Sequence, residues 1–205
     1  MARSGLGGDV MPGRVRIIAG SLKGRRLMVP RGSEVRPTGE RVREALFSAL
    51  GPVEGLLVVD LFAGTGALGL EALSRGAAKG VFVEADRRVA AVLARNVEAV
   101  GVKPRAEVWQ MDHQRALRRM RAAGVTVDLL FLDPPYRMLP AVLAEAAANL
   151  AEVLAPGGIL VIEAPRTFSA QHIPASLGHP AFEMVFERRY GDTVLIMIRK
   201  GNETT

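Results

Sequence analysis

The chain has 205 residues, of which 49% are hydrophobic, and no run of eighteen apolar residues, so we expect a single main domain without a membrane span. It contains no cysteine, which excludes disulfides and thiolate metal sites, and no signal-peptide pattern opens it, so we expect a cytoplasmic protein. The formal net charge is +6, with 23 Arg against 4 Lys, and guanidinium groups pair with phosphates and stack on bases, so nucleic acid is the first candidate partner.

The first part of the chain predicts a basic β-hairpin. Residues 1–13 contain four glycines and little periodicity, so we expect a flexible tail there. Two β-prone runs follow at 14–20 and 23–29, within an expected extension over residues 14–35. A merely solvated surface would explain the overall charge, but these two runs would repel themselves unless they faced solvent or a polyanion. They contain Arg14, Arg16, Lys23, Arg25 and Arg26.

A helix is expected at the start of the main domain, for which we predict bounds of 36–200, with a tail at 201–205. Pro30, Gly32 and Pro37 mark a linker, and Thr38 is placed to cap a helix that runs to Leu50. The predicted apolar stripe of this helix consists of Val42, Leu46 and Leu50, with Ala45 and Ala49.

From residue 51 the chain alternates between strands and helices. Apolar runs predict strands at 56–60, 80–84, 106–109, 128–133 and 158–163, and periodic segments predict helices near 67–75, 86–100, 112–123 and 139–154. This alternation is typical of a parallel sheet with helices on both faces. Runs at 181–190 and 193–199 flank Gly191-Asp192 and predict a hairpin that closes the sheet with antiparallel strands. The predicted fold class is therefore α/β.

A glycine-rich loop follows the first parallel strand. The run from Asp60 to Gly69 contains Gly64, Gly66 and Gly69, which let the backbone turn tightly and approach a ligand at the next helix. The pattern alone is weak evidence, because dinucleotide oxidoreductases share it and a purely structural turn could use two of the glycines. Glu84 lies 20 residues after Gly64, at the end of the second strand, where a carboxylate can accept hydrogen bonds from both ribose hydroxyls of a nucleotide.

NAD and S-adenosylmethionine both contain such a ribose, and Asp60 discriminates between them. A carboxylate directly before the loop would repel a pyrophosphate but attract the methionine ammonium of S-adenosylmethionine (SAM), so we expect SAM. After the third strand, Asp112 could accept a hydrogen bond from the adenine amine, with Met111 covering the ring. Capping of the next helix explains Asp112 equally well. For Trp109, core packing is the expected role.

The most specific string is Asp133-Pro134-Pro135-Tyr136, which follows an apolar strand. The prolines fix the turn, and the Pro134 carbonyl and the Asp133 carboxylate can accept the two hydrogens of an exocyclic amine while Tyr136 stacks on its base. The alternative is a structural turn in which Asp133 caps the next helix. The three histidines have no metal-ligand spacing, so we expect ordinary loop or surface residues and no metal site. They are His113, His172 and His179.

These motifs together resemble the amino-methyltransferases that act on nucleic acids. Closer similarity, over residues 14–199, is to the bacterial RsmD family, the 16S ribosomal RNA guanine-N2 methyltransferases. It is carried by Arg14-Val-Arg-Ile-Ile-Ala-Gly20, Gly24-Arg-Arg-Leu27, Arg36-Pro-Thr38 with Arg41-Val-Arg-Glu-Ala-Leu-Phe47, and Phe62-Ala-Gly-Thr-Gly-Ala-Leu-Gly-Leu-Glu-Ala-Leu-Ser-Arg75. The family often has Phe where this chain has Tyr136, and either ring can stack.

The resemblance implies a Rossmann-like SAM-dependent methyltransferase with a seven-stranded sheet, in which residues 36–47 lie over the cofactor and Thr38 and Arg41 bind its methionine end. Phe62, Ala63 and Ala85 join the expected cofactor site. The product of the cofactor would be S-adenosyl-L-homocysteine. The hairpin and Arg137 would hold phosphates while a flipped guanine enters against Tyr136.

The implied partner is 16S rRNA, within a partly or fully assembled small subunit, and we expect a monomer that uses no metal and no membrane. Several alternatives stay open at this point. An adenine-N6 methyltransferase of DNA or RNA would use the same catalytic motif, and a side-chain amide in a protein presents a similar amine. A non-enzymatic RNA-binding assembly factor would need only the hairpin, and a dinucleotide oxidoreductase would need only the glycine loop.

Overall fold

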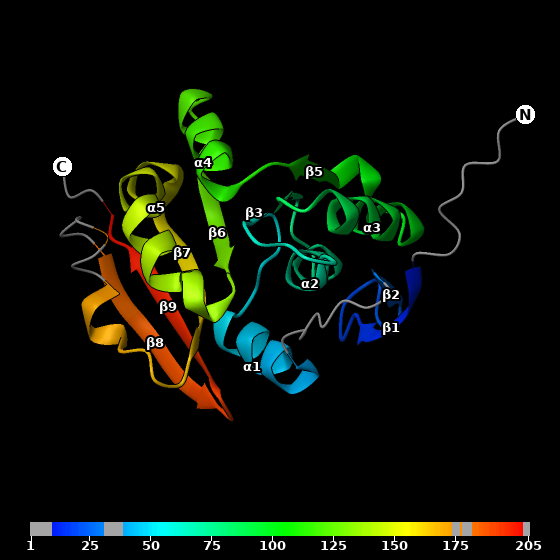
Figure 1. Cartoon of the computed structure of the whole chain (residues 1–205), viewed down its shortest axis with the longest axis horizontal. Coiled ribbons are helices and arrows are strands. Elements are labelled where there is room, and N and C mark those ends of the chain that lie inside the picture. Colours follow the sequence, from blue (N-terminus) through cyan, green and yellow to red (C-terminus); the bar gives the residue numbers. More distant parts are fainter. Residues whose placement is uncertain (1–9, 31–38, 174–176, 178–181, 203–205) are drawn as a thin grey trace, which may run out of the picture.

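The computed structural model describes residues 10–30, 39–173, 177 and 182–202, and these residues form a two-stranded sheet and a seven-stranded sheet with helices around it (Figure 1). The first sheet contains β1 (Val10–Arg16) and β2 (Arg26–Pro30). The second contains β3 (Leu57–Asp60), β4 (Lys79–Glu84), β5 (Ala106–Gln110), β6 (Val127–Leu132), β7 (Leu154–Pro165), β8 (Phe182–Tyr190) and β9 (Thr193–Lys200).

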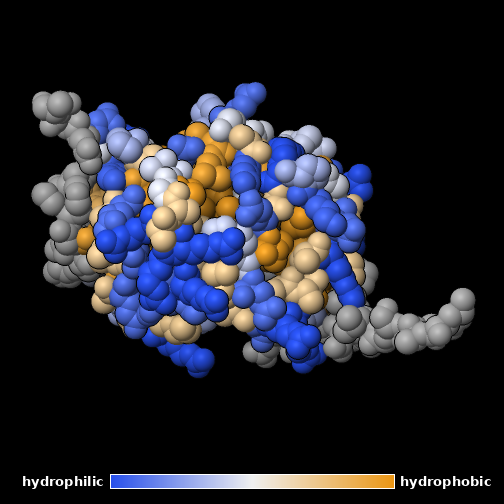
Figure 2. Space-filling view, turned by 90° about the horizontal axis from the view of Figure 1, so that it is seen from above, coloured by the Kyte–Doolittle hydropathy of each residue, from blue (hydrophilic) through white to orange (hydrophobic). Residues whose placement is uncertain are grey.

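The helices are α1 (Glu40–Leu50), α2 (Ala67–Ser74), α3 (Arg87–Ala99), α4 (His113–Ala122) and α5 (Leu139–Val153). Short 3-10 turns are η1 (Lys103–Arg105), η2 (Tyr136–Met138) and η3 (Ala170–His172). Among the described residues, no helix has the length and apolar character needed to cross a bilayer. The view from above in Figure 2 shows a mainly hydrophilic side of the molecule, in which hydrophobic areas are separated by polar ones.

The large sheet has the order β5-β4-β3-β6-β7-β9-β8. The first five strands are parallel, β9 is antiparallel to β7, and β8 is antiparallel to β9. The predicted Rossmann-like sheet with its antiparallel C-terminal hairpin is therefore confirmed. The chain continues from β3 to β4 and β5 on one side of β3, and then returns to β6 on its other side. In open parallel sheets, ligands bind at such a reversal of strand order, which here lies between the carboxyl ends of β3 and β6.

Alternate side chains of the central strands supply two apolar cores, one on each face of the sheet. Val59 and Leu130 belong to the core under α4 and α5, whereas Val58 and Leu129 belong to the core under α1, α2 and α3. The strand β7 begins four residues before its predicted start at 158. Its first residue, Leu154, pairs with Val127 before the register shifts, a bulge that the Pro156-Gly157-Gly158 run had hidden.

The basic hairpin shares the second core with the main domain. Val15, Ile17 and Leu27 are buried in it, and Asn96 of α3 both accepts from and donates to the backbone of Met28. The strand β1 already begins at Val10, whereas we expected residues 10–13 in the tail. Proline is tolerated in such a two-stranded edge, where the register shifts between Pro12 and Arg16.

The helix α1 follows its prediction in part. Its N-cap residue is Gly39, and the predicted capping residue Thr38 lies outside the described residues. Leu46 of the predicted apolar stripe is buried, and Val42 and Leu50 pack half-buried against the same core, whereas Ala49 is exposed. Arg43 and Phe47 are buried as well, outside the predicted stripe. The Arg43 side chain points inward, where its Nη2 donates to the carbonyl oxygen of Arg16 at 2.7 Å.

Candidate active site

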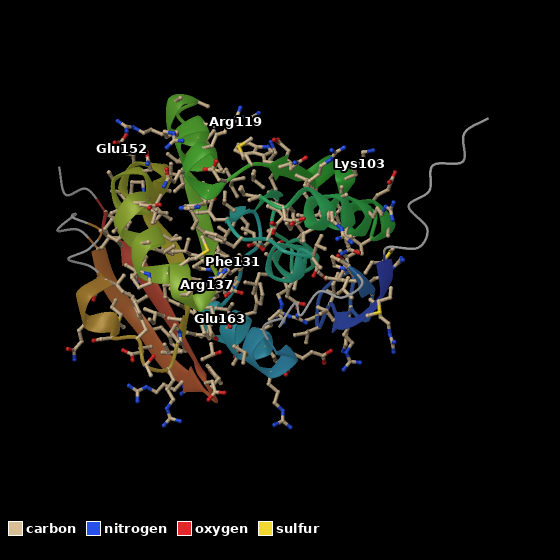
Figure 3. All side chains as sticks on the ribbon, viewed as in Figure 1. Lys103, Arg119, Phe131, Arg137, Glu152 and Glu163 are labelled. Carbon is tan, nitrogen blue, oxygen red and sulfur yellow. The ribbon has the colours of Figure 1, made fainter. Side chains whose placement is uncertain are left out.

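The acidic residues singled out in the sequence gather at one end of the sheet. Asp60 ends β3 and lies opposite Phe131 of β6, and Glu84 ends β4. Asp133 follows β6, whose last residue, Leu132, pairs with Ile162 of β7. In Figure 3, Phe131 and Arg137 lie toward this end, whereas Arg119 and Glu152 lie near α4 at the opposite side of the view. The fold thus brings the predicted cofactor loop and the predicted catalytic turn to the same edge.

Asp60 is a buried acid at this edge, with 2% of its surface exposed. Its Oδ2 accepts a hydrogen bond of 3.2 Å from the backbone amide of Gly69, while its Oδ1 has no hydrogen-bond partner among the described residues. Burial is the main cause that raises the pKa of Asp60 to about 7, and the charge of Glu84 adds to it, while the backbone amides of Gly69 and Phe62 act in the opposite direction. A buried carboxylate oxygen without a donor fits a cationic ligand group such as the methionine ammonium of SAM.

The glycine loop is held in place by Glu84. The Oε2 atom of Glu84 accepts from the amide of Gly64 at 3.0 Å, and Oε1 accepts from the amide of Asp86 at 2.8 Å. Each carboxylate oxygen can accept a further bond, so ribose hydroxyls can add to this arrangement. Gly64 and Gly66 have positive φ angles of 52° and 92°, and a Cβ on Gly64 would meet nothing within 4 Å. The loop therefore leaves open space beside its backbone. Ala63 in the same loop is buried, whereas Ala85 is exposed.

Asp112 caps α4, as one of its two predicted roles required. Its Oδ1 accepts from the amide of Arg115 at 2.8 Å, and this bond is the largest cause that lowers the pKa of Asp112. The side chain stays exposed, so capping does not bury the carboxylate. Met111 and Trp109 are half-buried against the core under α4, which confirms core packing for Trp109.

His113 was missed by the sequence analysis, which expected a loop or surface residue. It opens α4 with a side chain only 10% exposed, and its ring centroid lies 5.1 Å from that of Phe62. Burial is the main cause that lowers the pKa of His113, and its Nε2 has no hydrogen-bond partner among the described residues. Among the described residues, no group of three or more His, Cys, Asp or Glu side chains is placed to hold a metal ion. His113 thus supports the half-buried Phe62 ring at the loop.

The predicted catalytic turn leads into η2. Asp133 is half-buried, Pro134 is buried, and the amide of Met138 donates to the carbonyl oxygen of Pro135 at 2.7 Å. The N-cap residues of η2 and α5 are Pro135 and Met138, and neither makes a side-chain capping bond. The Asp133 carboxylate and the Pro134 carbonyl belong to the turn at the sheet edge.

Tyr136 has partners that sequence reasoning missed. Its hydroxyl lies 2.6 Å from Oγ1 of Thr193, at the start of β9, and 3.5 Å from Oε1 of Glu163 in β7. Both partners come from strands on the far side of β6, which fixes the tyrosine ring from the C-terminal half of the sheet. Glu163 could have been noticed as the acid that ends the predicted strand 158–163, whereas nothing local marks Thr193.

The cationic candidates differ in exposure and in pairing. Lys23, Arg25, Arg26, Arg41 and Arg137 are exposed, and the side chain of Arg14 lies outside the described part of the chain. Arg16 is exposed but already paired, because its Nε and Nη2 donate to both carboxylate oxygens of Glu40 over 3.0 to 3.2 Å. This hydrogen bonding with Glu40 is the largest cause that raises the pKa of Arg16.

Known proteins share this fold and part of this sequence. The E. coli Ribosomal RNA small subunit methyltransferase D is 37% identical over 80% of this chain and 81% of its own length. The solved structure of the E. coli yhhF protein has a TM-score of 0.78 at 31% identity and covers 93% of this chain and 100% of its own. An RNA methyltransferase from Salinibacter ruber, solved with S-adenosyl-L-homocysteine, shares the fold at 20% identity and a TM-score of 0.62, over 82% and 96% of the two chains.

The sheet order and the acid-flanked glycine loop define a Rossmann-like methyltransferase of the SAM-dependent class. The family model described as Conserved hypothetical protein 95 matches residues 15–199. The chain belongs to that family, which is the RsmD family.

Proposed function

We propose that this protein transfers a methyl group from SAM to the exocyclic N2 amine of a guanine in small-subunit ribosomal RNA. The observation that carries the proposal is the Asp133-Pro134-Pro135-Tyr136 turn, which ends at the same sheet edge as the buried Asp60 and the glycine loop. The E. coli relative, named for methylation of the small-subunit RNA, supports the choice of polymer.

The cofactor is held by the loop side of this edge. Asp60 receives the methionine ammonium on its unpartnered Oδ1, and Glu84 accepts from the ribose hydroxyls. Thr38 and Arg41 bind the methionine carboxylate, Met111, Asp112 and Phe62 surround the adenine, and Ala63, Gly64, Gly66 and Ala85 contribute backbone. When bound, SAM supplies an electrophilic methyl group on a sulfonium.

The catalytic turn acts on the amine of the base. Because the lone pair of an exocyclic amine is delocalised into the ring, two acceptors that hold its hydrogens favour the pyramidal, positively charged transition state. The Asp133 carboxylate and the Pro134 carbonyl take this role, and Tyr136 stacks on the base to orient it. After methylation the amine is acidic, and its extra proton leaves through Asp133 or water.

The exposed basic residues bind the RNA backbone around a flipped guanine. Lys23, Arg25 and Arg26 on the hairpin and Arg137 beside the catalytic turn supply this contact, with Arg14 and Arg16 as further members. We place the protein in the cytoplasm as a monomer that acts on a partly or fully assembled small subunit.

The proposal is tested with labelled SAM and unmodified small-subunit RNA, offered naked and assembled, followed by nucleoside mass analysis. We expect N2-methylguanosine as the product. N6-methyladenosine as the only product would overturn the choice of base, and methylated protein without methylated RNA would overturn the choice of polymer.

A matched variant separates an enzyme from a non-catalytic assembly factor. We expect Asp133→Ala to reduce methyl transfer by at least about 100-fold, comparable to the loss of one transition-state hydrogen-bond partner in other enzymes. Its affinities for SAM and RNA should stay within about threefold of the wild type, because the change removes no cofactor contact. A wild-type protein that binds RNA but not SAM would instead support the assembly factor.

A further inference from the structure

Glu163 is a buried acid beside the catalytic turn to which the proposed reaction gives no role. It is 9% exposed and lies in β7, the strand next to β6. Because Leu132 pairs with Ile162 in this parallel pair, the residues that follow them, Asp133 and Glu163, stand at the same level of neighbouring strands. Figure 3 shows Glu163 toward the same end of the sheet as Phe131 and Arg137.

The Glu163 carboxylate is also fixed relative to the ring on which the base would stack. Its Oε1 lies 3.5 Å from the Tyr136 hydroxyl, and that hydroxyl is held at 2.6 Å by Thr193 Oγ1. A base stacked on Tyr136, with its amine at Asp133 and Pro134, would therefore bring the adjoining part of its Watson–Crick edge toward Glu163.

The two purines differ at that part of the edge. Guanine presents three donors there, the two hydrogens of N2 and the hydrogen of N1, whereas adenine presents the two hydrogens of N6 and a lone pair on N1. Asp133 and the Pro134 carbonyl account for two hydrogens of either amine. A third acceptor beside them matches the N1 hydrogen of guanine and opposes the N1 lone pair of adenine.

We propose that Glu163 accepts a hydrogen bond from N1–H of the target guanine and thereby selects guanine over adenine. This inference rests on the proposed function, since it assigns the base specificity of the same site. Glu163 would touch the substrate directly and leave the methyl transfer to the catalytic turn.

The test uses RNA in which the target guanine is replaced by 2-aminopurine, which keeps the N2 amine but has a lone pair in place of the N1 hydrogen. We expect the wild type to prefer guanine by at least about 100-fold in kcat/KM, since buried polar groups strongly reject substrates that leave them unpaired. In Glu163→Gln the amide can donate to that lone pair, and we expect the preference to fall by at least about 30-fold.

A control separates direct reading of the base from positioning of Tyr136. Tyr136→Phe keeps the ring and removes the hydroxyl that contacts Glu163, so we expect it to preserve the wild-type preference for guanine over 2-aminopurine. If Tyr136→Phe lowers the preference as much as Glu163→Gln, the carboxylate acts through the tyrosine and the inference is overturned.

Methylation of the two RNAs by the wild type alone also tests the inference. A wild-type enzyme that methylates both RNAs equally well overturns the inference even if Glu163→Gln does not fold, which a thermal melt and SAM binding would reveal. A wild type that methylates neither RNA, while remaining folded and able to bind SAM, overturns the proposed guanine activity itself.

Discussion

Glu71, in the middle of α2, accepts a hydrogen bond of 2.7 Å from the backbone amide of Ile18, two residues after the end of β1. Its other oxygen accepts from the amide of Ala19 at 3.0 Å and from Nε of Arg75 at 2.7 Å. The side chain of Glu71 is fully buried, and the helix that carries it begins directly after the glycine loop. The hairpin that we propose to bind RNA is thus attached to the helix that supports the cofactor loop.

Replacement of this carboxylate should destabilise the protein strongly. Glu71→Ala leaves two backbone amides without their acceptor and the guanidinium of Arg75 without its partner, so we expect the free energy of unfolding to fall by about 3 kcal/mol. Urea denaturation measures the change. Glu44→Ala, on the exposed side of α1, is the control and should change the free energy by less than about 0.5 kcal/mol. Equal effects of the two substitutions would contradict the anchoring role.

Two glycines of the hairpin turn provide a matched pair for the close approach to α2. Gly20 and Gly24 have φ angles of 81° and 84°, so alanine at either position has the same backbone strain. A Cβ at Gly20 would lie 1.9 Å from the carbonyl oxygen of Ser74, whereas one at Gly24 would meet nothing within 4 Å.

We therefore expect Gly20→Ala to lower the melting temperature and the RNA affinity far more than Gly24→Ala. The hairpin must move away from the C-terminal end of α2 in the first variant. SAM binding should change less, because the glycine loop precedes the other end of this helix. Thermal melts and RNA binding measured side by side test this. The same loss in both variants would mean that strain, rather than the contact with Ser74, dominates.

The sheet and the cofactor loop could be predicted because their signals are local. An apolar run such as 128–133 defines its own strand, and the predicted bounds of β3 to β6 agree with the structure to within one residue. The loop that follows Asp60 is likewise a contiguous string. Contacts of side chains with residues far away in the sequence gave no such local signal. Arg43 looks like a surface residue of α1 until the carbonyl oxygen of Arg16 is brought beside it.

The candidate site likewise combines a local motif, which could be predicted, with long-range contacts, which could not. Asp133 and Tyr136 stand in one recognisable motif, but the contact of Tyr136 with Thr193 joins residues 57 positions apart. That contact depends on β9 lying antiparallel to β7, which sequence patterns indicate only in outline. The pairing of Arg16 with Glu40 is another such case, because the hairpin and α1 had to be placed before their charges could be matched.

The raised pKa of Asp60 predicts how cofactor affinity varies with pH. Below about 7 the buried carboxyl holds a proton, and this must leave before the acid can pair with the methionine ammonium. We expect the affinity for SAM to rise by up to about tenfold per pH unit between pH 5.5 and 7 and then to level off. Calorimetric titration measures it. Asp60→Asn should bind SAM at least about 100-fold more weakly at pH 7.5, without this pH dependence.

The same pKa has the opposite sign for the stability of the cofactor-free protein. Between the ordinary value of 3.8 and about 7, the folded chain keeps a proton on Asp60 that the unfolded chain has lost. The contribution of this group to stability is therefore present at low pH and is lost as the pH rises through this window. The unfolding free energy of the wild type minus that of Asp60→Asn should therefore decrease as the pH rises from about 4 to about 7. An increase of this difference with pH would contradict the raised pKa of Asp60.

The ion pair between Arg16 and Glu40 predicts that Glu40 reduces the affinity of the hairpin for RNA. Arg16 is exposed but donates to both oxygens of Glu40, so a phosphate must compete with that carboxylate for the guanidinium. Glu40→Gln removes the competing charge, and we expect RNA affinity at low salt to rise by about two- to fivefold, the size of a typical exposed ion pair.

Arg25 is the reference residue for this effect, because it is exposed on the same hairpin. Arg25→Ala should weaken RNA binding and reduce the slope of log affinity against log salt by about 0.7 to 0.9, as expected for the loss of one phosphate contact. Arg16→Ala should reduce this slope less than Arg25→Ala does when Glu40 is present. In the Glu40→Gln background, where the Arg16 guanidinium is available to phosphate, Arg16→Ala should reduce the slope as much as Arg25→Ala does. Equal slopes for Arg16→Ala in both backgrounds would show that RNA does not compete with Glu40 for this arginine.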